Sequence, residues 1–390
     1  MAPQDRLTAT FTRAERVAPT PLRSIPQLRV DGLSVSYGPH EVVTNVSFEL
    51  GRGESLALIG ESGSGKSTIA RAVLRLLPSG GHATGRVAFD GQEVLGISER
   101  GFRPLRGRAI GFVPQDPANS LNPVRTIGAQ FKDAIDAHAD YTPERTRARS
   151  VEVLDLVGID PVHLRSYPHQ LSGGMRQRAM IAMALLFTPD LVIMDEPTSA
   201  LDVVAQRSLM VQIKDLQRRL GFAVVFVTHD MSLVSHFSDR LLVMYAGQVV
   251  EAGPTRTVFD RPAHPYSRGL LDAFPSVRGP RVPLTGIPGA PPDLARPPAG
   301  CRFHPRCPVA FDDCPHVAPE LYQVGDARAR CLLHAPDRSA PTTSAAAAVP
   351  AADPADDPVG ESAGEPVGAR VGEPVGAPVD EPAEEEEVRR

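Results

Sequence analysis

Hydrophobic and polar positions recur with two different periods along the chain. Near the start they alternate, which is typical of strands with one buried face. The alternating segments, separated by glycine, proline or asparagine, are 28–38, 41–50 and 55–60. Further along, apolar residues recur at the three- and four-residue spacing of helices. The segments with this spacing are roughly 66–77, 143–157, 173–187 and 203–220.

Two short apolar runs lie between the later helices, at 191–196 (LVIMDE) and 223–230 (AVVFVTHD). They are too short for helices and resemble strands buried on both faces. Strands that alternate with helices predict an α/β fold, with a mainly parallel sheet covered by helices on both faces. Residues 241–253 predict a terminal hairpin.

Proline divides the chain into four parts. Residues 27–253 hold 11 of the 39 prolines, whereas 254–338 hold 16. We therefore expect a flexible arm over 1–26, a conventional globular domain over 27–253 and a small irregular extension over 254–338. Residues 339–390 consist largely of Ala, Pro, Gly, Val and Glu, and they predict a disordered acidic tail.

Composition excludes several classes of protein. The longest apolar run, Ala179–Phe187, has nine residues, well below the roughly 18–20 that a membrane-spanning helix needs. The first residues lack the apolar centre of a signal peptide, so we expect the chain to stay in the cytosol. Residues 351–390 carry 12 acidic and 3 basic side chains. The remainder is only mildly basic and has no basic tract suited to nucleic acid.

Residues Gly60–Ser67 (GESGSGKS) match the pattern G-x-x-x-x-G-K-[ST] between a predicted strand and a predicted helix. In that context the glycines let successive N–H groups turn toward phosphates at the start of the helix. Lys66 would pair with the β- and γ-phosphates, and the Ser67 hydroxyl would bind magnesium. A plain Gly/Ser turn that caps a helix is the alternative, which the strand–turn–helix context disfavours.

The strand at 191–196 ends in Asp195 and Glu196. Asp195 is predicted to lie near the magnesium, and Glu196 beside the γ-phosphate as the base for the attacking water. The alternative is that Asp195 and Glu196 are simply solvated carboxylates at the end of a strand. That alternative would carry about equal weight if the phosphate loop were not present upstream.

With these motifs the sequence resembles the ATP-binding cassette (ABC) ATPases, and further segments fit that family. Residues 171–178 (LSGGMRQR) look like its signature, and the resemblance implies that this segment binds the γ-phosphate held by an opposing subunit. Gln115 resembles the glutamine that contacts magnesium and water, Asp202 belongs to a segment like the D-loop, and His229 resembles the switch histidine. Tyr37 matches the aromatic residue that stacks on adenine.

The resemblance implies an ATP-hydrolysing dimer with magnesium. Its catalytic residues would be Glu196, His229 and Gln115. Its magnesium ligands would be Ser67, Gln115 and Asp195. Its nucleotide-binding residues would be Tyr37, Gly60, Glu61, Ser62, Gly63, Ser64, Gly65, Lys66, Ser67, Thr68, Gln115, Ser172, Gly173, Gly174, Asp195 and Asp202. The implied fold has an antiparallel β subdomain, a mainly parallel core and a helical signature subdomain.

A narrower resemblance follows, because 264–271 (HPYSRGLL) and 286–307 look like the C-terminal extension of oligopeptide/dipeptide importer ATPases. Nickel, glutathione and opine importers share that extension. The resemblance implies two permease subunits, a second homologous ATPase in a heterodimer or homodimer, and an extracytoplasmic substrate-binding protein. It also implies a peripheral location on the cytoplasmic face of a bacterial plasma membrane, and no nucleic acid.

All four cysteines lie in this extension, at Cys301, Cys307, Cys314 and Cys331. Four thiolates can hold a zinc ion or an iron–sulfur cluster. The gaps lack Cys-x-x-Cys pairs, and resemblance to some dipeptide importer ATPases favours a [4Fe–4S] cluster, with zinc or free thiols as alternatives. Histidines nearby, at His304, His316 and His334, could replace a thiolate or could be ordinary loop residues.

A soluble ABC protein of translation or DNA repair is a second function class. Such proteins usually carry two cassettes or a long coiled-coil insertion, and this chain has neither. The sequence therefore favours the importer.

Overall fold

Two β-sheets organise the computed structural model, which describes residues 25–198, 201–273 and 286–336. In spatial order the strands of the larger sheet are β11 (Tyr322–Val324), β12 (Ala327–Ala329), β10 (Gln248–Pro254), β9 (Arg240–Tyr245), β3 (Ser55–Ile59), β8 (Ala223–Val227), β7 (Leu191–Asp195) and β6 (Ile110–Val113). Strands β9, β3, β8, β7 and β6 pair in parallel. The prediction of a mainly parallel core is confirmed.

The smaller sheet is antiparallel. Its strands in spatial order are β2 (His40–Leu50), β1 (Leu28–Tyr37), β4 (Gly81–Phe89) and β5 (Gln92–Glu93). The alternation along 28–50 therefore predicted its first two strands. Strand β4 was not predicted, although it pairs with β1 along most of its length.

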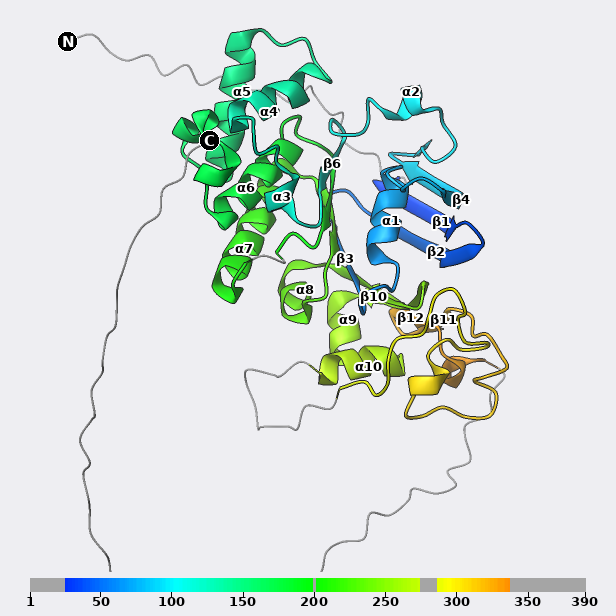
Figure 1. Ribbon diagram of the computed structural model, residues 1–390. Helices are drawn as coiled ribbons and strands as arrows, with labels where there is room; N and C mark the ends of the chain where they lie inside the picture. The colour runs from blue at the N-terminus through cyan, green and yellow to red at the C-terminus, as the bar shows by residue number, and fades with distance from the viewer. Residues whose placement is uncertain (1–24, 199–200, 274–285, 337–390) are drawn as a thin grey trace, which may run out of the picture. The chain divides into compact units, whose positions relative to one another are not determined.

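The helices surround the larger sheet (Figure 1). They are α1 (Lys66–Val73), α2 (Glu99–Phe102), α3 (Pro117–Ser120), α4 (Ile127–Asp136), α5 (Pro143–Leu156), α6 (Gly173–Ala184), α7 (Val203–Leu220), α8 (Met231–Phe237), α9 (Thr255–Asp260) and α10 (Pro265–Asp272). The four predicted helices are α1, α5, α6 and α7. Helix α1 ends earlier than expected, and Arg75 just beyond it has a positive φ of 54°.

Alternate residues of the central strands belong to two apolar clusters on opposite faces of the sheet. Ile193 and Val225 pack in the cluster that contains the buried side of α1. Their neighbours Met194 and Phe226 pack in the cluster that contains α6 and α7. Because successive strand residues point to opposite faces, these helices cover opposite sides of β7 and β8. This arrangement places the amino end of α1 beyond the carboxyl end of β3, where the phosphate loop lies.

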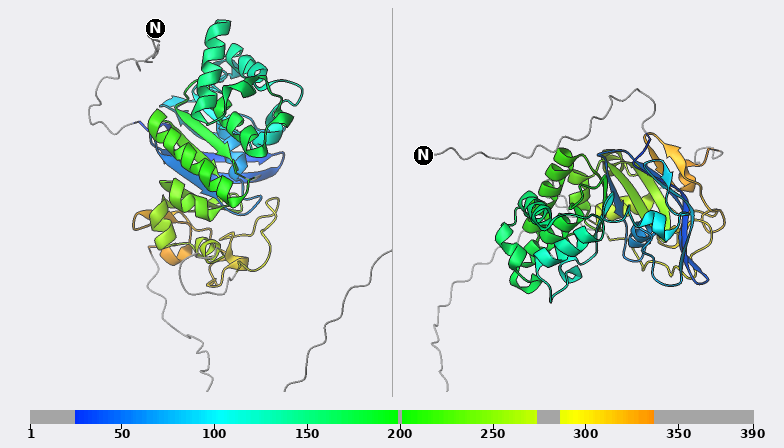
Figure 2. Two further views of the ribbon diagram at one scale, coloured as in Figure 1. Left: turned by 90° about the vertical axis from the view of Figure 1, so that its left-hand side faces the viewer. Right: turned by 90° about the horizontal axis from the view of Figure 1, so that it is seen from above.

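The extension is more regular than the sequence predicted. The expected hairpin at 241–253 is present as β9 and β10. Beyond it come α9 and α10, and then β12, which pairs with β10 through Glu251 opposite Ala329. The larger sheet thus runs across residue 253, where the sequence suggested a domain boundary. Figure 2 shows residues 286–336 of the extension beside α9 and α10, far from the helical region of α4 and α5.

The remaining predictions concern segments at the ends of the chain. The acidic tail, residues 339–390, and all but the last residues of the arm at 1–26 lie outside the described residues. Among the helices of the described ranges, none is long and apolar enough to span a membrane.

Candidate functional site

The loop between β3 and α1 needs glycine at its two ends. Gly60 has a φ of 149°, and a Cβ there would lie 2.2 Å from the carbonyl oxygen of Met244. Gly65 has a φ of 101° and directly precedes α1. Both conformations are open to glycine and costly for other residues. The loop can therefore turn tightly and direct its N–H groups to one point.

Lys66 is held at the mouth of this loop. Its side chain is buried, and Nζ donates hydrogen bonds of 2.9 Å to the carbonyl oxygens of Gly60 and Glu61. Burial lowers the pKa of Lys66, while the carboxylates of Glu196 and Asp195 act in the opposite direction. The ammonium group therefore lacks full compensation in a buried place, which favours an anionic ligand.

Ser67 and Asp195 meet across the loop and the sheet. The Ser67 hydroxyl donates a 2.7 Å hydrogen bond to Oδ1 of Asp195. Asp195 is 1% exposed, burial raises its pKa, and its Oδ2 has no hydrogen-bond partner within the described residues. Hydroxyl and carboxylate oxygens are the ligands that magnesium prefers, and a hydrated ion would supply the missing partner. These two residues fit a magnesium site.

Glu196 is the centre of a second group. It has a φ of 47°, and its N–H donates to the carbonyl oxygen of Val227 at 2.8 Å. Nε2 of Gln115 donates to Oε2 of Glu196 at 3.4 Å, and Nδ1 of His229 lies 3.6 Å from Oε1. Three residues far apart in the sequence, all predicted to be catalytic, therefore meet at one carboxylate. The strained backbone of Glu196 is consistent with a functional position.

The signature residues and Asp202 are separate from this group. Ser172 caps α6 by accepting a 3.3 Å hydrogen bond from the N–H of Met175, and Asp202 caps α7 in the same way from Ala205 at 2.9 Å. Ser172 and Gly173 are exposed, and within the described residues Ser172, Gly173 and Gly174 form no hydrogen bond with the phosphate loop. The structure leaves these groups open to a second molecule.

The other predicted nucleotide-binding residues lie in or near the loop. Ser62 and Gly63 are exposed at its tip, whereas Ser64 is buried and its hydroxyl has no partner within the described residues. Thr68 is half-buried in the first turn of α1. Tyr37 ends β1 opposite Gly81 of β4 and packs against the cluster that contains α1.

One residue at this site was not predicted. Arg306 of the extension binds the carboxylate of Glu61 with two contacts, at 2.7 Å and 2.9 Å. The sequence did contain a signal, because a carboxylate inside a phosphate-binding loop calls for a nearby cation. It gave no indication of which of the many arginines would supply it.

The four cysteines converge on one cavity, which Phe303 and His304 also line. Cys314 and Cys331 are buried, and the N–H of Cys301 donates to the carbonyl oxygen of Cys314 at 2.8 Å. Burial raises the pKa of the thiols of Cys301 and Cys307, and raises that of Cys331 to about 11. Within the described ranges, no three His, Cys, Asp or Glu side chains are placed to hold a metal ion. The side chains as placed do not form a ligand set, so the structure does not support the predicted [4Fe–4S] cluster.

The nearby histidines have other partners. Nδ1 of His304 contacts the carbonyl oxygen of Cys301, and Nε2 of His334 that of Ala263, both at 2.9 Å. Each contact engages one ring nitrogen with a backbone carbonyl, an arrangement that occurs in structural and in metal-bound histidines alike.

Comparisons with known proteins agree with this geometry. Residues 43–199 match the ABC transporter family, and 250–314 match the oligopeptide/dipeptide transporter C-terminal region. The chain is 41% identical over 308 residues to the oligopeptide transport ATP-binding protein OppD of Bacillus subtilis, covering 77% of this chain and 86% of the relative. For OppD of Escherichia coli the identity is 42% over 325 residues, and the match covers 83% of this chain and 96% of the relative.

Solved structures give the same fold. CbiO1 of Clostridium perfringens, part of the ABC transporter complex cbiONQ, matches with a TM-score of 0.53 at 30% identity, over 60% of this chain and 91% of that one. A dimeric post-hydrolysis state of the cassette MJ0796 with ADP and Pi matches with a TM-score of 0.52 at 28% identity. The match covers 59% of this chain and 99% of that one.

Proposed function

The chain belongs to the ABC transporter ATPases of the oligopeptide/dipeptide group, and we propose that it hydrolyses ATP to drive the import of di- or oligopeptides. The observation that carries this proposal is the hydrogen-bonded site in which Lys66, Ser67 and Asp195 lie beside a separately held Glu196. The relatives named for oligopeptide transport share the core and most of the extension.

In this proposal, backbone N–H groups and the Lys66 ammonium of the phosphate loop bind the phosphates. The N–H groups at the start of α1 and the ammonium of Lys66 bind the β- and γ-phosphates of ATP, so Lys66 exchanges loop carbonyls for phosphate oxygens. Magnesium, when bound, neutralises charge on the phosphates. Ser67 and Asp195 would hold it, with Gln115 as a further ligand.

Hydrolysis uses Glu196 as the base. The oxygen of a water molecule attacks the γ-phosphorus, the bond from that phosphorus to the bridging oxygen breaks, and ADP and phosphate form. Glu196 takes the proton of the water. Gln115 and His229 hold its carboxylate from two sides, which fixes the direction of proton transfer.

A second ATPase subunit completes the site in this proposal. Ser172, Gly173 and Asp202 are exposed at the starts of α6 and α7, and the matched cassette MJ0796 is dimeric. A partner's phosphates would reach Ser172, Gly173, Gly174 and Asp202 from outside the chain. The partner is a homologous ATPase, in a heterodimer or a homodimer. Closure of the dimer on ATP then moves two permease subunits docked near Gln115, on the cytoplasmic face of the membrane. A substrate-binding protein delivers the peptide, and no nucleic acid takes part.

We further propose the predicted organisation of the chain, with the ATPase domain over 27–253, the extension over 254–338, and the arm and tail outside them. The four cysteines remain a proposed [4Fe–4S] site, with zinc as the alternative. The side chains as placed do not form a ligand set within the described residues, so this proposal rests on the four thiols lining one cavity. Anaerobically purified protein should be brown and contain iron; a colourless protein that contains zinc would overturn the cluster.

Peptide uptake into vesicles with the permeases tests the main proposal. Lys66→Ala should abolish both ATP hydrolysis and uptake, because it removes the buried cation from the phosphate loop. Lys132→Ala is a matched control, since Lys132 is exposed on α4 and pairs only with Asp136 within the described residues. Uptake of nickel, glutathione or an opine in place of peptides would reassign the substrate. Recovery of ribosomes or DNA instead of permeases would reject the transport function.

A further inference from the structure

A partly buried ion pair joins the phosphate loop to the cysteine-bearing segment. Nη1 of Arg306 lies 2.7 Å from Oε2 of Glu61, and Nη2 lies 2.9 Å from Oε1. The Arg306 side chain is 6% exposed and that of Glu61 is 25% exposed. The two parallel contacts match the fork of a guanidinium to a carboxylate, which is the strong and directional form of this pair.

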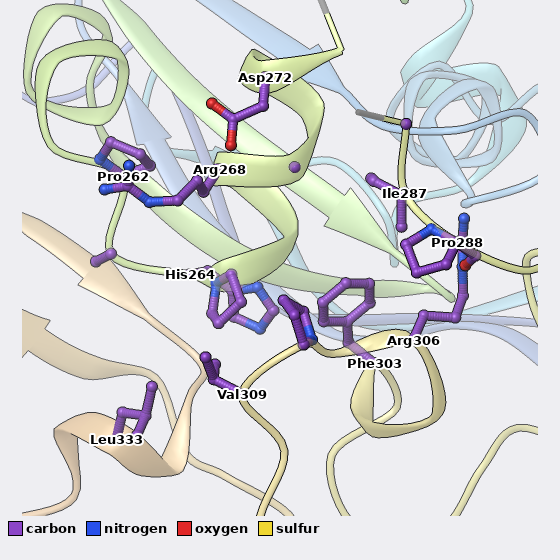
Figure 3. Close-up of a pocket in the computed structure, with 15 residues that line it drawn as sticks. Pro262, His264, Arg268, Asp272, Ile287, Pro288, Phe303, Arg306, Val309 and Leu333 are labelled. Atoms are coloured by element: carbon purple, nitrogen blue, oxygen red, sulfur yellow. The ribbon is translucent and has the colours of Figure 1, made fainter. Parts of the chain in front are cut away.

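Arg306 is itself fixed by the extension. Nε donates to the carbonyl oxygen of Pro288 at 2.8 Å, and Nη1 also contacts the hydroxyl of Tyr245 at 3.4 Å. Figure 3 shows Arg306 next to Pro288 at the border of a cavity of about 460 Å³, with Phe303 beside it. The guanidinium therefore reaches Glu61 from a rigid support.

The backbone of Glu61 is held from the same side. Its N–H donates to the hydroxyl of Tyr266 at 2.9 Å, and Tyr266 is a fully buried residue of α10. The carbonyl oxygen of Glu61 in turn accepts the 2.9 Å hydrogen bond from Nζ of Lys66. A continuous path of contacts thus leads from the extension through Glu61 to the cation that would bind phosphate.

The negative charge of Glu61 is the reason why its contact with Arg306 matters for ATP binding. Glu61 places a carboxylate within a loop that must accept the negative phosphates of ATP. At the low effective dielectric of a part-buried site, an uncompensated carboxylate would repel them. Arg306 neutralises this charge and turns it toward the extension.

We propose that Arg306 is a positioning residue for ATP binding, which neutralises and orients Glu61 so that the phosphate loop can accept the nucleotide. The proposal rests on the ATP site proposed above. It gives the extension a direct part in nucleotide affinity, independent of any metal at the cysteines.

The test is the ATP dependence of hydrolysis, together with direct nucleotide binding, by the full-length protein. Arg306→Met should raise the KM and Kd for ATP about tenfold, with kcat changed less than about twofold. Adding Glu61→Gln to Arg306→Met should return both constants to within about threefold of the wild-type values, because the repelling charge is gone. A purely structural role of Arg306 would not be rescued in this way.

Arg330→Met is the matched control. Arg330 is another arginine of the extension and is half-buried, but it donates to the carbonyl oxygens of Val249 and Pro319 rather than to a carboxylate of the loop. Its substitution should leave the KM for ATP unchanged. An unchanged KM in Arg306→Met, or a double variant no better than the single one, would overturn the proposal.

Two further variants keep the test decisive. If Arg306→Met does not fold, Arg306→Lys retains the charge without the two-point contact and should raise the KM about threefold; an unchanged KM overturns the proposal. Lys66→Ala in the same binding assay reports on the ATP site itself. If Lys66→Ala still binds ATP, the proposed function fails; if it does not and Arg306→Met binds normally, only this inference fails.

Discussion

The core sheet and the extension are held in place by different forces. The central strands are buried on both faces, and neighbours such as Ile193 and Met194 pack against different helices. The extension shares a smaller apolar cluster with the core, in which Val258, Tyr266, Phe303 and Ala327 pack against residues such as Tyr245. It is fastened by arginines that reach the core: Arg302 to Ala246 and Thr44, Arg306 to Glu61, and Arg330 to Val249. The core is thus fixed by apolar contact on both faces of its sheet, and the extension by one smaller apolar cluster together with a small number of polar anchors.

The largest effect is expected at the carboxyl end of the core strand β7, which Glu196 directly follows. Glu196→Gln should lower ATP turnover about 10²- to 10⁴-fold, because the amide cannot take the proton of the attacking water. ATP binding should persist, since Lys66 and Ser67 are unchanged. Steady-state hydrolysis and equilibrium nucleotide binding measure the two properties. Unchanged turnover would remove Glu196 as the base and weaken the contrast between a catalytic core and a supporting extension.

The aromatic group of the extension allows a test of how local its stability is. Phe303 is 2% exposed and its ring contacts those of Tyr245 and Tyr266, with centroids 5.1 Å and 5.3 Å away. Phe303→Ala should cost about 3–5 kcal/mol, expressed as faster hydrogen exchange over 286–336 while β7 and β8 stay protected. Phe131→Ala removes an equally buried phenylalanine from the core and should reduce protection more widely. Equal loss in both variants would show that the two regions unfold together.

Lowering the pH is expected to destabilise the extension by less than the Phe303 substitution does. His264 is fully buried, its Nδ1 accepts a 3.0 Å hydrogen bond from the N–H of Tyr266, and burial lowers its pKa from 6.5 to about 3. A hydrogen bond with the backbone of Arg330 acts in the opposite direction and is outweighed by burial, while the positive charge of Arg330 lowers the pKa further. The folded state therefore keeps His264 neutral, while the unfolded state binds a proton below about pH 6.5. Stability contributed by the neutral ring is lost as the pH falls from 6.5 toward 3.

Between pH 7 and pH 5 this residue alone should lower the free energy of unfolding of the extension by about 2 kcal/mol. Hydrogen exchange of α10 at the two pH values measures the change. In His264→Asn, which keeps a side chain able to cap α10 but does not titrate, the pH dependence should largely disappear. A pH dependence equal to that of the wild-type protein would assign the effect to another group.

The smallest effect is expected for an exposed ion pair of the extension. Arg256 and Asp260 lie one turn apart on α9 at 3.4 Å, with side chains 94% and 63% exposed. Arg256→Ala should change the free energy of unfolding by less than about 0.5 kcal/mol in denaturant titrations. A change of several kcal/mol would mean that exposed charges, and not only the buried arginines, fasten the extension.

Much of the ATP site could be predicted because its chemistry is local. The phosphate loop has its glycines, Lys66 and Ser67 within eight consecutive residues, and the loop conformation follows from the glycines. Asp195 and Glu196 follow a strand whose apolar run is visible in the sequence. Parallel pairing then brings the ends of β3, β7 and β8 together, and Ser67 meets Asp195.

The rest could not be predicted because it depends on pairs that are distant in the chain. Arg306 and Glu61 are 245 positions apart, and nothing in the local pattern distinguishes Arg306 from Arg302. Strand β12 has three residues, too few for an alternating pattern, so its pairing with β10 appears only in the folded protein. The spacing grouped the four cysteines, and they do line one cavity, but whether they hold a metal depends on side-chain positions that spacing does not fix.

The pairing of β12 with β10 also has a consequence for the solubility of the protein. Without β12, the outer N–H and C=O groups of β10 would form an unpaired sheet edge of seven residues, which is a template for association with other chains. The hairpin covers the middle of this edge, where Glu251 and Ala252 pair with β12, and it ends in β11, which has only three residues. A chain shortened to its ATPase core is therefore expected to self-associate, so the extension protects the core from aggregation whether or not ATP is bound.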